Sequence, residues 1–170
     1  MRTELILQQT WFLNLSQQQQ ELIKQSLLLL DKARKDHYVF YDYSYIVMPA
    51  AKAYEGFVKD FLYDLGLISH SQLWGKRFRV GRSLNPELEK NPKTEKLSIY
   101  NDLKLLCHNQ HFPEKLWQTW KLCRNQIFHY FNRKFLVLTL DQAEQRLDMI
   151  IETIGNSLTF CVITDNRFDS

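Results

Sequence analysis

Apolar residues recur at the spacing of an α-helix along four segments of this chain, and few residues interrupt them. In the last segment, Leu147, Ile151, Ile154 and Leu158 follow one another at i, i+4, i+7 and i+11. This spacing puts an apolar stripe on one side of a helix, which has to pack against another element to leave water. The chain has only five Gly and four Pro among its 170 residues, so it is poor in tight turns. The pattern therefore predicts an all-α fold.

Capping residues place the ends of the expected helices. Ser16 and Gln19 have the spacing of a capping box at a helix start, and Asp141 and Glu144 form a second pattern of this kind. Gly66 is suited to the left-handed conformation that commonly ends a helix. We therefore expect a bundle of four main helices, at residues 16–35, 45–65, 113–131 and 141–158.

The segments between these helices are expected to be short elements and loops. Short accessory helices are predicted near 86–90 and 97–108, and a brief strand within 132–140. Residues 1–15 are expected to form an N-terminal arm, and residues 67–86 a long basic loop. A chain of 170 residues is long enough to bury a substantial core, so we expect one domain.

Charge and cysteine content restrict the classes of function. The net charge of +3 is mildly basic, which permits a polyanionic partner without requiring one. Cys107, Cys123 and Cys161 are isolated and far apart, so neither a zinc site nor a disulfide framework is expected. No signal peptide is expected, and no apolar run is long enough to span a bilayer. We therefore expect a cytoplasmic protein without a membrane partner.

The helix expected at 113–131 carries the motif RNQIFH, from Arg124 to His129. Asn125 and His129 are four residues apart, so they share a helix face, with Arg124 and Lys121 at its borders. A polar face opposite an apolar one is usually just solvated, so a solvated face and a reaction centre both stay open. The apolar stripe of the same helix is expected to consist of Leu116, Trp120, Cys123, Ile127 and Phe131.

The residue types in this motif suit the cleavage of RNA. Histidine has a pKa near neutrality and can move a proton at the 2′-hydroxyl or at the leaving 5′-oxygen. Arginine offers a planar fork for the charge that builds on the phosphoryl oxygens during the reaction. An amide one turn before the histidine, as Asn125 is before His129, can hold the orientation of the imidazole ring.

The motif RNQIFH resembles the Arg-x(4–6)-His motif of HEPN domains, including the polar Asn that commonly follows the Arg. HEPN domains are all-α bundles of about this length, with the motif in a late helix. Many are metal-independent endoribonucleases of toxin–antitoxin, abortive-infection and CRISPR systems, and two motif helices meet across a dimer. The resemblance implies a homodimeric endoribonuclease without a cofactor, with Arg124, Asn125 and His129 in its site. It also implies an antitoxin or regulatory protein as a further partner.

A second candidate segment, KAYEGF, lies in the helix expected at 45–65 and places Lys52 and Glu55 three residues apart. Glu55 adjoins the apolar stripe of that helix, so it is either a member of a partly buried ion pair or a catalytic accessory. The segment is similar to one in HEPN toxins of the RNase LS type, in which a basic residue and a Glu approach the Arg/His pair. That resemblance adds Lys52 and Glu55 to the expected catalytic group.

The segment HSQLWGKRFRVGRSLNP, residues 70–86, holds four basic residues and no acidic one. Trp74 and Phe78 are interleaved with them and are suited to stacking on unpaired bases. A plain solvated loop accounts for the same composition and stays an alternative. The residues expected to contact RNA phosphates are Lys76, Arg77, Arg79, Arg82 and Lys121.

These observations lead to one main hypothesis of function and two alternatives. The main hypothesis is a HEPN toxin or phage-defence effector that cleaves RNA by attack of its 2′-hydroxyl, at a composite site between two copies. The first alternative is an inactive HEPN-like bundle that binds RNA or a partner protein. The second is a helical interaction domain unrelated to HEPN, in which the motif is a coincidence.

Overall fold

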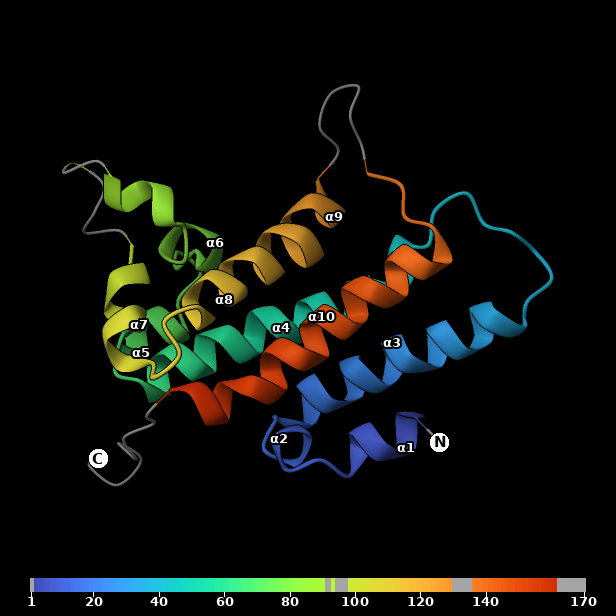
Figure 1. Ribbon diagram of the computed structural model, residues 1–170, viewed down its shortest axis with the longest axis horizontal. Coiled ribbons are helices and arrows are strands. Elements are labelled where there is room, and N and C mark those ends of the chain that lie inside the picture. Colours follow the sequence, from blue (N-terminus) through green and yellow to red (C-terminus); the bar gives the residue numbers. More distant parts are fainter. Residues whose placement is uncertain (1, 91–92, 94–97, 130–135, 162–170) are drawn as a thin grey trace.

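Four long helical stretches form the body of the protein, as Figure 1 shows for the computed structural model. The structure describes residues 2–90, 93, 98–129 and 136–161. These residues contain no named β-strand, and the predicted all-α fold is confirmed. The four stretches are α3 (Gln17–Lys35), α4 (Ser44–Asp64), the joined segments α8 (Phe112–Trp120), η3 (Lys121–Asn125) and α9 (Gln126–Phe128), and α10 (Leu140–Phe160).

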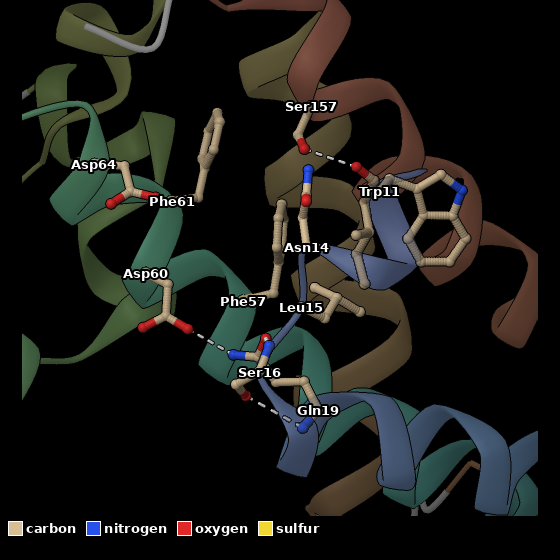
Figure 2. A pocket seen from close by; sticks show the side chains of 11 residues that line it. Trp11, Asn14, Leu15, Ser16, Gln19, Phe57, Asp60, Phe61, Asp64 and Ser157 are labelled. Carbon is tan, nitrogen blue, oxygen red and sulfur yellow. Dashed lines mark hydrogen bonds between the residues drawn. The ribbon is translucent and has the colours of Figure 1, made fainter. Parts of the chain in front are cut away.

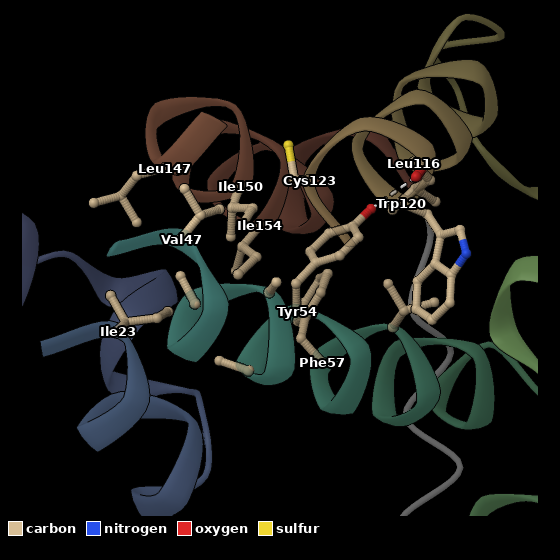
Figure 3. Packing of buried hydrophobic residues seen from close by; sticks show 14 of the residues in the cluster. Ile23, Val47, Tyr54, Phe57, Leu116, Trp120, Cys123, Leu147, Ile150 and Ile154 are labelled. Atoms are coloured by element: carbon tan, nitrogen blue, oxygen red, sulfur yellow. Dashed lines mark hydrogen bonds between the residues drawn. The ribbon is translucent and has the colours of Figure 1, made fainter. Parts of the chain in front are cut away.

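Helix α4 is the central element of the bundle. It packs most extensively against α3 and next against α10, and its buried residues lie on one broad side of the helix. An apolar face of this width is stable only when other elements cover it. Figure 3 shows Tyr54 of α4 reaching toward Leu116 of α8, where its hydroxyl donates a hydrogen bond of 2.9 Å to the Leu116 carbonyl. Tyr54 therefore ties the central helix to the helix that carries the motif.

The predicted start of α3 and end of α4 are confirmed. Ser16 Oγ accepts a hydrogen bond from the Gln19 N–H, and Gln19 Oε1 accepts one from the Ser16 N–H, which is a capping box. Gly66 has a φ of 72°, the left-handed conformation in which glycine carries no Cβ penalty. Both ends follow from local chemistry.

The predicted start of the last helix is wrong. Thr139 and Gln142 form the capping box, in place of Asp141 and Glu144, so the cap of α10 lies two residues before the predicted cap, Asp141. The cause lies in the preceding segment, whose Leu138 N–H donates to Asp42 Oδ1 and fixes where the extended chain ends. The predicted strand is absent from 136–139, and residues 130–135 lie outside the described part of the chain.

The apolar face of α10 lies slightly to one side of the predicted stripe. Leu147 and Ile154 are fully buried as expected, but Ile150 is buried in place of Ile151, which is only partly covered. The side chain of Leu158 is outside the description. Figure 3 shows Leu147, Ile150 and Ile154 above α4.

Short helices occupy the segments that were expected to be an arm and a loop. Phe12, within the expected arm, is buried in the core, because the helix around it packs against α10. The expected loop is interrupted by two one-turn helices. These short elements are α1 (Arg2–Leu7), α2 (Thr10–Leu13), α5 (His70–Leu73), α6 (Val80–Ser83), the 3₁₀ helix η1 (Pro86–Lys90) and α7 (Tyr100–Leu106).

The cysteines do not all stay apart as expected. Cys107 follows α7 and Cys161 follows α10, and the two form a disulfide across a sequence separation of 54 residues. The prediction failed because the spacing of cysteines in a sequence does not show which helix ends meet in space. Cys123 is a buried free thiol, and burial raises its pKa to about 12. None of the described helices combines the length and apolar character needed to cross a membrane.

Candidate functional site

The motif helix changes its geometry where the motif begins. After the regular α8, residues Lys121–Asn125 form a π-helix, in which the Gln126 N–H donates to the Lys121 carbonyl, five residues back. A π-helical turn holds one more residue than an α-helical turn, and such turns occur frequently at functional sites. The α-helical geometry then returns for the three residues of α9.

The predicted extension of this helix to Phe131 is wrong at His129. His129 has φ of −113° and ψ of 128°, an extended conformation, so the helix ends at Phe128. Aromatic and β-branched residues have modest helix propensity, so such a segment is helical only where packing holds it. Phe128 is already 38% exposed, which shows that packing is ending there. Phe131 lies outside the described residues.

Arg124 lies between two aromatic rings of its own helix. The guanidinium carbon is 5.0 Å from the ring centroid of Trp120 and 5.1 Å from that of Phe128. The two residues stand four positions before and four positions after Arg124. Contacts of a guanidinium with two aromatic rings restrict its rotation.

A carboxylate from the central helix also contacts Arg124. Arg124 Nε donates a hydrogen bond of 3.2 Å to Glu55 Oε2, across 69 residues of sequence. Both side chains are partly covered, with 26% of Arg124 and 32% of Glu55 exposed. An ion pair at this depth contributes little to stability, on the order of 1 kcal/mol. Its clearer effect is to orient the guanidinium.

The other catalytic candidates, Asn125, His129 and Lys52, do not share one helix face with the Arg124–Glu55 pair as expected. Asn125 is the last residue of the π-helical segment, and His129 is beyond the helix end, so the predicted stacking four residues apart is wrong. His129 is exposed. Lys52 is exposed one turn before Glu55, and it forms no ion pair within the described part of the chain.

The basic candidates divide into two groups. Arg77, Arg79 and Arg82 line one cavity of 330 Å³ between α5 and α6. Lys76 is exposed in the same segment but does not line the cavity, and Lys121 is exposed at the start of the π-helical segment. The expected stacking residues also differ, because Phe78 lines the cavity whereas Trp74 is 74% exposed.

Sequence reasoning missed the part that Trp120 and Gly81 take in the site. Trp120 was expected only as a core residue, yet its ring also covers the Arg124 guanidinium. Gly81 lies directly against the indole, so close that a Cβ on Gly81 would be 2.1 Å from Trp120 Nε1. Aromatic residues four positions on either side of an arginine were a signal for the first contact. No local signal indicates the second.

A second cavity, of 190 Å³, lies where α2, α3, α4 and α10 meet (Figure 2). Two carboxylates, Asp60 and Asp64, line it, and Gln19 Nε2 donates a hydrogen bond of 2.6 Å to Asp60 Oδ2. Burial raises the pKa of Asp60 above its ordinary value, although the bond from Gln19 acts in the opposite direction. This cavity is acidic, and none of the predicted site residues lines it. The sequence did not predict it.

Among the described residues, no group of three or more His, Cys, Asp or Glu side chains is arranged to hold a metal ion. Comparison of this chain with known protein families, with curated proteins and with solved structures found no match.

Proposed function

We propose that this chain is a metal-independent endoribonuclease of the HEPN type. One observation carries the proposal, namely that Arg124 of the motif is oriented by Glu55 and by two aromatic rings. Its one hydrogen bond within the described part of the chain uses Nε, so both Nη groups remain for a phosphate. A fixed, multiply contacted arginine at the surface is what phosphoryl transfer requires of its charge-stabilising group.

In the proposed reaction, the 2′-oxygen of the RNA attacks the adjacent phosphorus as its proton leaves to a base. The bond from phosphorus to the 5′-oxygen breaks, and that oxygen takes up a proton from an acid. Arg124 stabilises the charge on the phosphoryl oxygens, and His129 transfers one of the two protons. The products are a 2′,3′-cyclic phosphate and a 5′-hydroxyl.

The proposal includes a homodimer that contributes both motif segments to a composite site. Phe128 is partly exposed and His129 is exposed, at the end of the helix that carries Arg124. A second copy that covers this end would exclude water and supply a second histidine. In the cell, such an enzyme would act as a toxin or phage-defence effector under the control of an antitoxin or another regulator.

Cleavage of RNA in EDTA tests the proposal. We expect the wild type to cleave single-stranded RNA to fragments with cyclic phosphate ends. Arg124→Ala and His129→Ala each lower the rate by about 10²- to 10³-fold. The matched controls are Lys24→Ala and His37→Ala, which remove one cation and one exposed imidazole on or near α3 and leave the rate unchanged. Equal rates for all five proteins, or no cleavage by the wild type, would disprove the proposal.

Glu55→Gln separates orientation from charge within the same site. The amide oxygen can still accept a hydrogen bond from Arg124 Nε, but the charge-assisted part of the bond is lost. We expect a fall in the rate of about tenfold, smaller than the effect of Arg124→Ala.

The binding subunit remains a second candidate, and two observations favour it. The carboxylate of Glu55 already pairs with Arg124, and His129 leaves the helix in place of facing Asn125. This candidate predicts RNA binding without cleavage, and unchanged binding in His129→Ala. Growth arrest of a host that depends on His129 would exclude it.

A further inference from the structure

Both charged and apolar residues line the cavity between α5 and α6. The charged ones are Arg77, Arg79 and Arg82, and the apolar ones, which form its apolar wall, are Phe78, Ile68 and Ile99. Its volume of 330 Å³ is within the range of small-molecule sites, near the lower end. Phe78 and Ile99 also pack against the hydrophobic core, which keeps the apolar wall in place.

The three arginines have no counter-charge in this cavity. No carboxylate lines it, and none of the three forms an ion pair with another described residue. Elsewhere in the chain, Arg34 pairs with Glu144 and Arg124 pairs with Glu55. Like charges that share a cavity repel one another, so an anion that entered would be bound by all three. The planar fork of arginine favours a phosphate among anions.

An apolar wall beside a phosphate site matches the chemistry of a nucleotide. A base can stack on the ring of Phe78 or lie against Ile68 and Ile99 while its phosphate contacts the arginines. We propose that this cavity is a subsite for one nucleotide unit, with Arg77, Arg79 and Arg82 on the phosphate and Phe78 on the base. The proposal that this cavity binds a nucleotide does not require that the protein cleave RNA. The proposal that the nucleotide belongs to the RNA substrate rests on the proposed function.

The position of the cavity supports that assignment. Gly81, between Arg79 and Arg82, lies against the indole of Trp120, and the face of the same ring covers Arg124. In Figure 1, α6 lies beside the segment formed by α8 and η3. If one nucleotide of an RNA chain occupied the cavity, the adjacent nucleotides of that chain would therefore extend toward Arg124.

Binding of a labelled RNA that cannot be cleaved tests the proposal. The probe is a single-stranded decamer with 2′-O-methyl groups at every position, followed by fluorescence anisotropy. We expect Arg77→Gln, Arg79→Gln and Arg82→Gln each to weaken binding by about 3- to 10-fold and the triple variant by at least about 50-fold. The matched control, Lys32→Gln, removes the same charge from the exposed surface of α3, outside the cavity, and we expect a change of less than about twofold.

A salt titration guards against a variant that merely fails to fold. The three arginines neutralise one phosphate in this proposal, so their loss lowers the slope of log K against log salt by about 0.7 for a single strand. Partial unfolding scales the affinity without that change. Phe78→Leu keeps an apolar wall but removes the ring, and we expect it to weaken binding with the slope unchanged. An unchanged affinity in the triple variant, or an equal loss in Lys32→Gln, overturns the proposal.

Competition identifies the source of the nucleotide unit. Displacement of the probe by AMP at far lower concentrations than by inorganic phosphate supports a nucleotide site. Decamer affinity at least about 100-fold above that of AMP then assigns the site to an RNA chain, and comparable affinities assign it to a free nucleotide. Equal displacement by AMP and phosphate overturns the role of the apolar wall.

Cleavage measured in parallel separates the two proposals. If the arginine variants lose binding but the wild type cleaves no RNA, the subsite stands and the proposed enzyme falls. If the wild type cleaves and the triple variant cleaves equally well at low RNA concentration, the enzyme stands and the subsite falls.

Discussion

The guanidinium of Arg124 lies near the rings of Trp120 and Phe128, and its Nε contacts Glu55. Each contact is weak at this exposure, about 1 kcal/mol or less. Together they restrict the side chain to one orientation before any ligand arrives. Because the side chain is already ordered, it loses less conformational entropy when a ligand binds. This effect on ligand binding is larger than the effect of the contacts on the stability of the fold.

Gly81→Ala tests whether Trp120 has to stay where it is. The added Cβ would lie 2.1 Å from Trp120 Nε1, so the indole has to move away from its present position. We expect a loss of about 1–3 kcal/mol in the free energy of unfolding in urea. We also expect a fall in the proposed RNA cleavage, because Arg124 loses its contact with the ring of Trp120. The matched control is Gly155→Ala, whose Cβ would lie 3.3 Å from Trp11 Nε1. Equal effects of the two substitutions would contradict this account.

Glu114 gives a pH dependence at the residue scale. The hydrogen bonds from Gln118 and then from Tyr100 lower its pKa below the ordinary value. The ionised group therefore stabilises the fold above its ordinary pKa, and this contribution is lost as pH falls through the folded-state pKa.

For Glu114→Gln we expect a loss of about 1 kcal/mol at pH 7 in urea unfolding, because the charge-assisted part of both bonds disappears. The difference between the variant and the wild type should shrink toward pH 3. A difference that stays constant with pH would show that packing and not charge is responsible.

At the scale of elements, the π-helical segment decides what the motif can do. A continuous α-helix would stack Asn125 and His129 on one face. The actual helix widens by one residue per turn at Lys121–Asn125 and ends at Phe128, so Arg124 points toward α4 and His129 lies beyond the helix end. The position of α8 against α4 depends in turn on Tyr54.

Tyr54→Phe tests that contact between the two helices. The variant keeps the ring in the core but removes the donor to the Leu116 carbonyl, which is buried in the same place. We expect a loss of about 1–2 kcal/mol in the free energy of unfolding, with the slope against urea unchanged. Tyr63→Phe on the same helix, 38% exposed, is the control and should change stability by less than about 0.5 kcal/mol. Equal stability of both variants would rule out an energetic part for the Tyr54 hydroxyl.

At the scale of the whole molecule, the disulfide joins the ends of two elements far apart in sequence. Cys107 and Cys161 close a loop of 54 residues that contains α8, the motif segments and α10. A crosslink of this span removes conformational entropy from the unfolded chain, which in the entropic model stabilises the fold by about 4 kcal/mol.

Thermal melting with and without dithiothreitol tests this contribution. We expect the reductant to lower the Tm of the oxidised wild type by about 10 °C or more, because about 4 kcal/mol is large for a domain of this size. The double variant Cys107→Ser/Cys161→Ser should have the Tm of the wild type in dithiothreitol, whether or not the reductant is present. An unchanged Tm of the wild type in dithiothreitol would show that the pair does not stabilise the fold.

Several features of the fold were predictable because their causes are local. Helical periodicity depends on neighbours along the chain, and the capping box at Ser16 and the turn at Gly66 each depend on a few adjacent residues. The start of α10 was misplaced by two residues because two capping patterns overlap, and the contact of Leu138 with Asp42 selects one.

The candidate site divides in the same way. The sequence by itself determined an all-α fold, the presence of Arg124 and His129 in one motif, and a basic segment at residues 76–82. Only the tertiary structure decided that Glu55 meets Arg124, that the helix ends before His129, and that three arginines share a cavity while Lys76 does not. The physical reason is that these relations join residues whose distance is set by how helices pack, and packing depends on side chains from all of them at once.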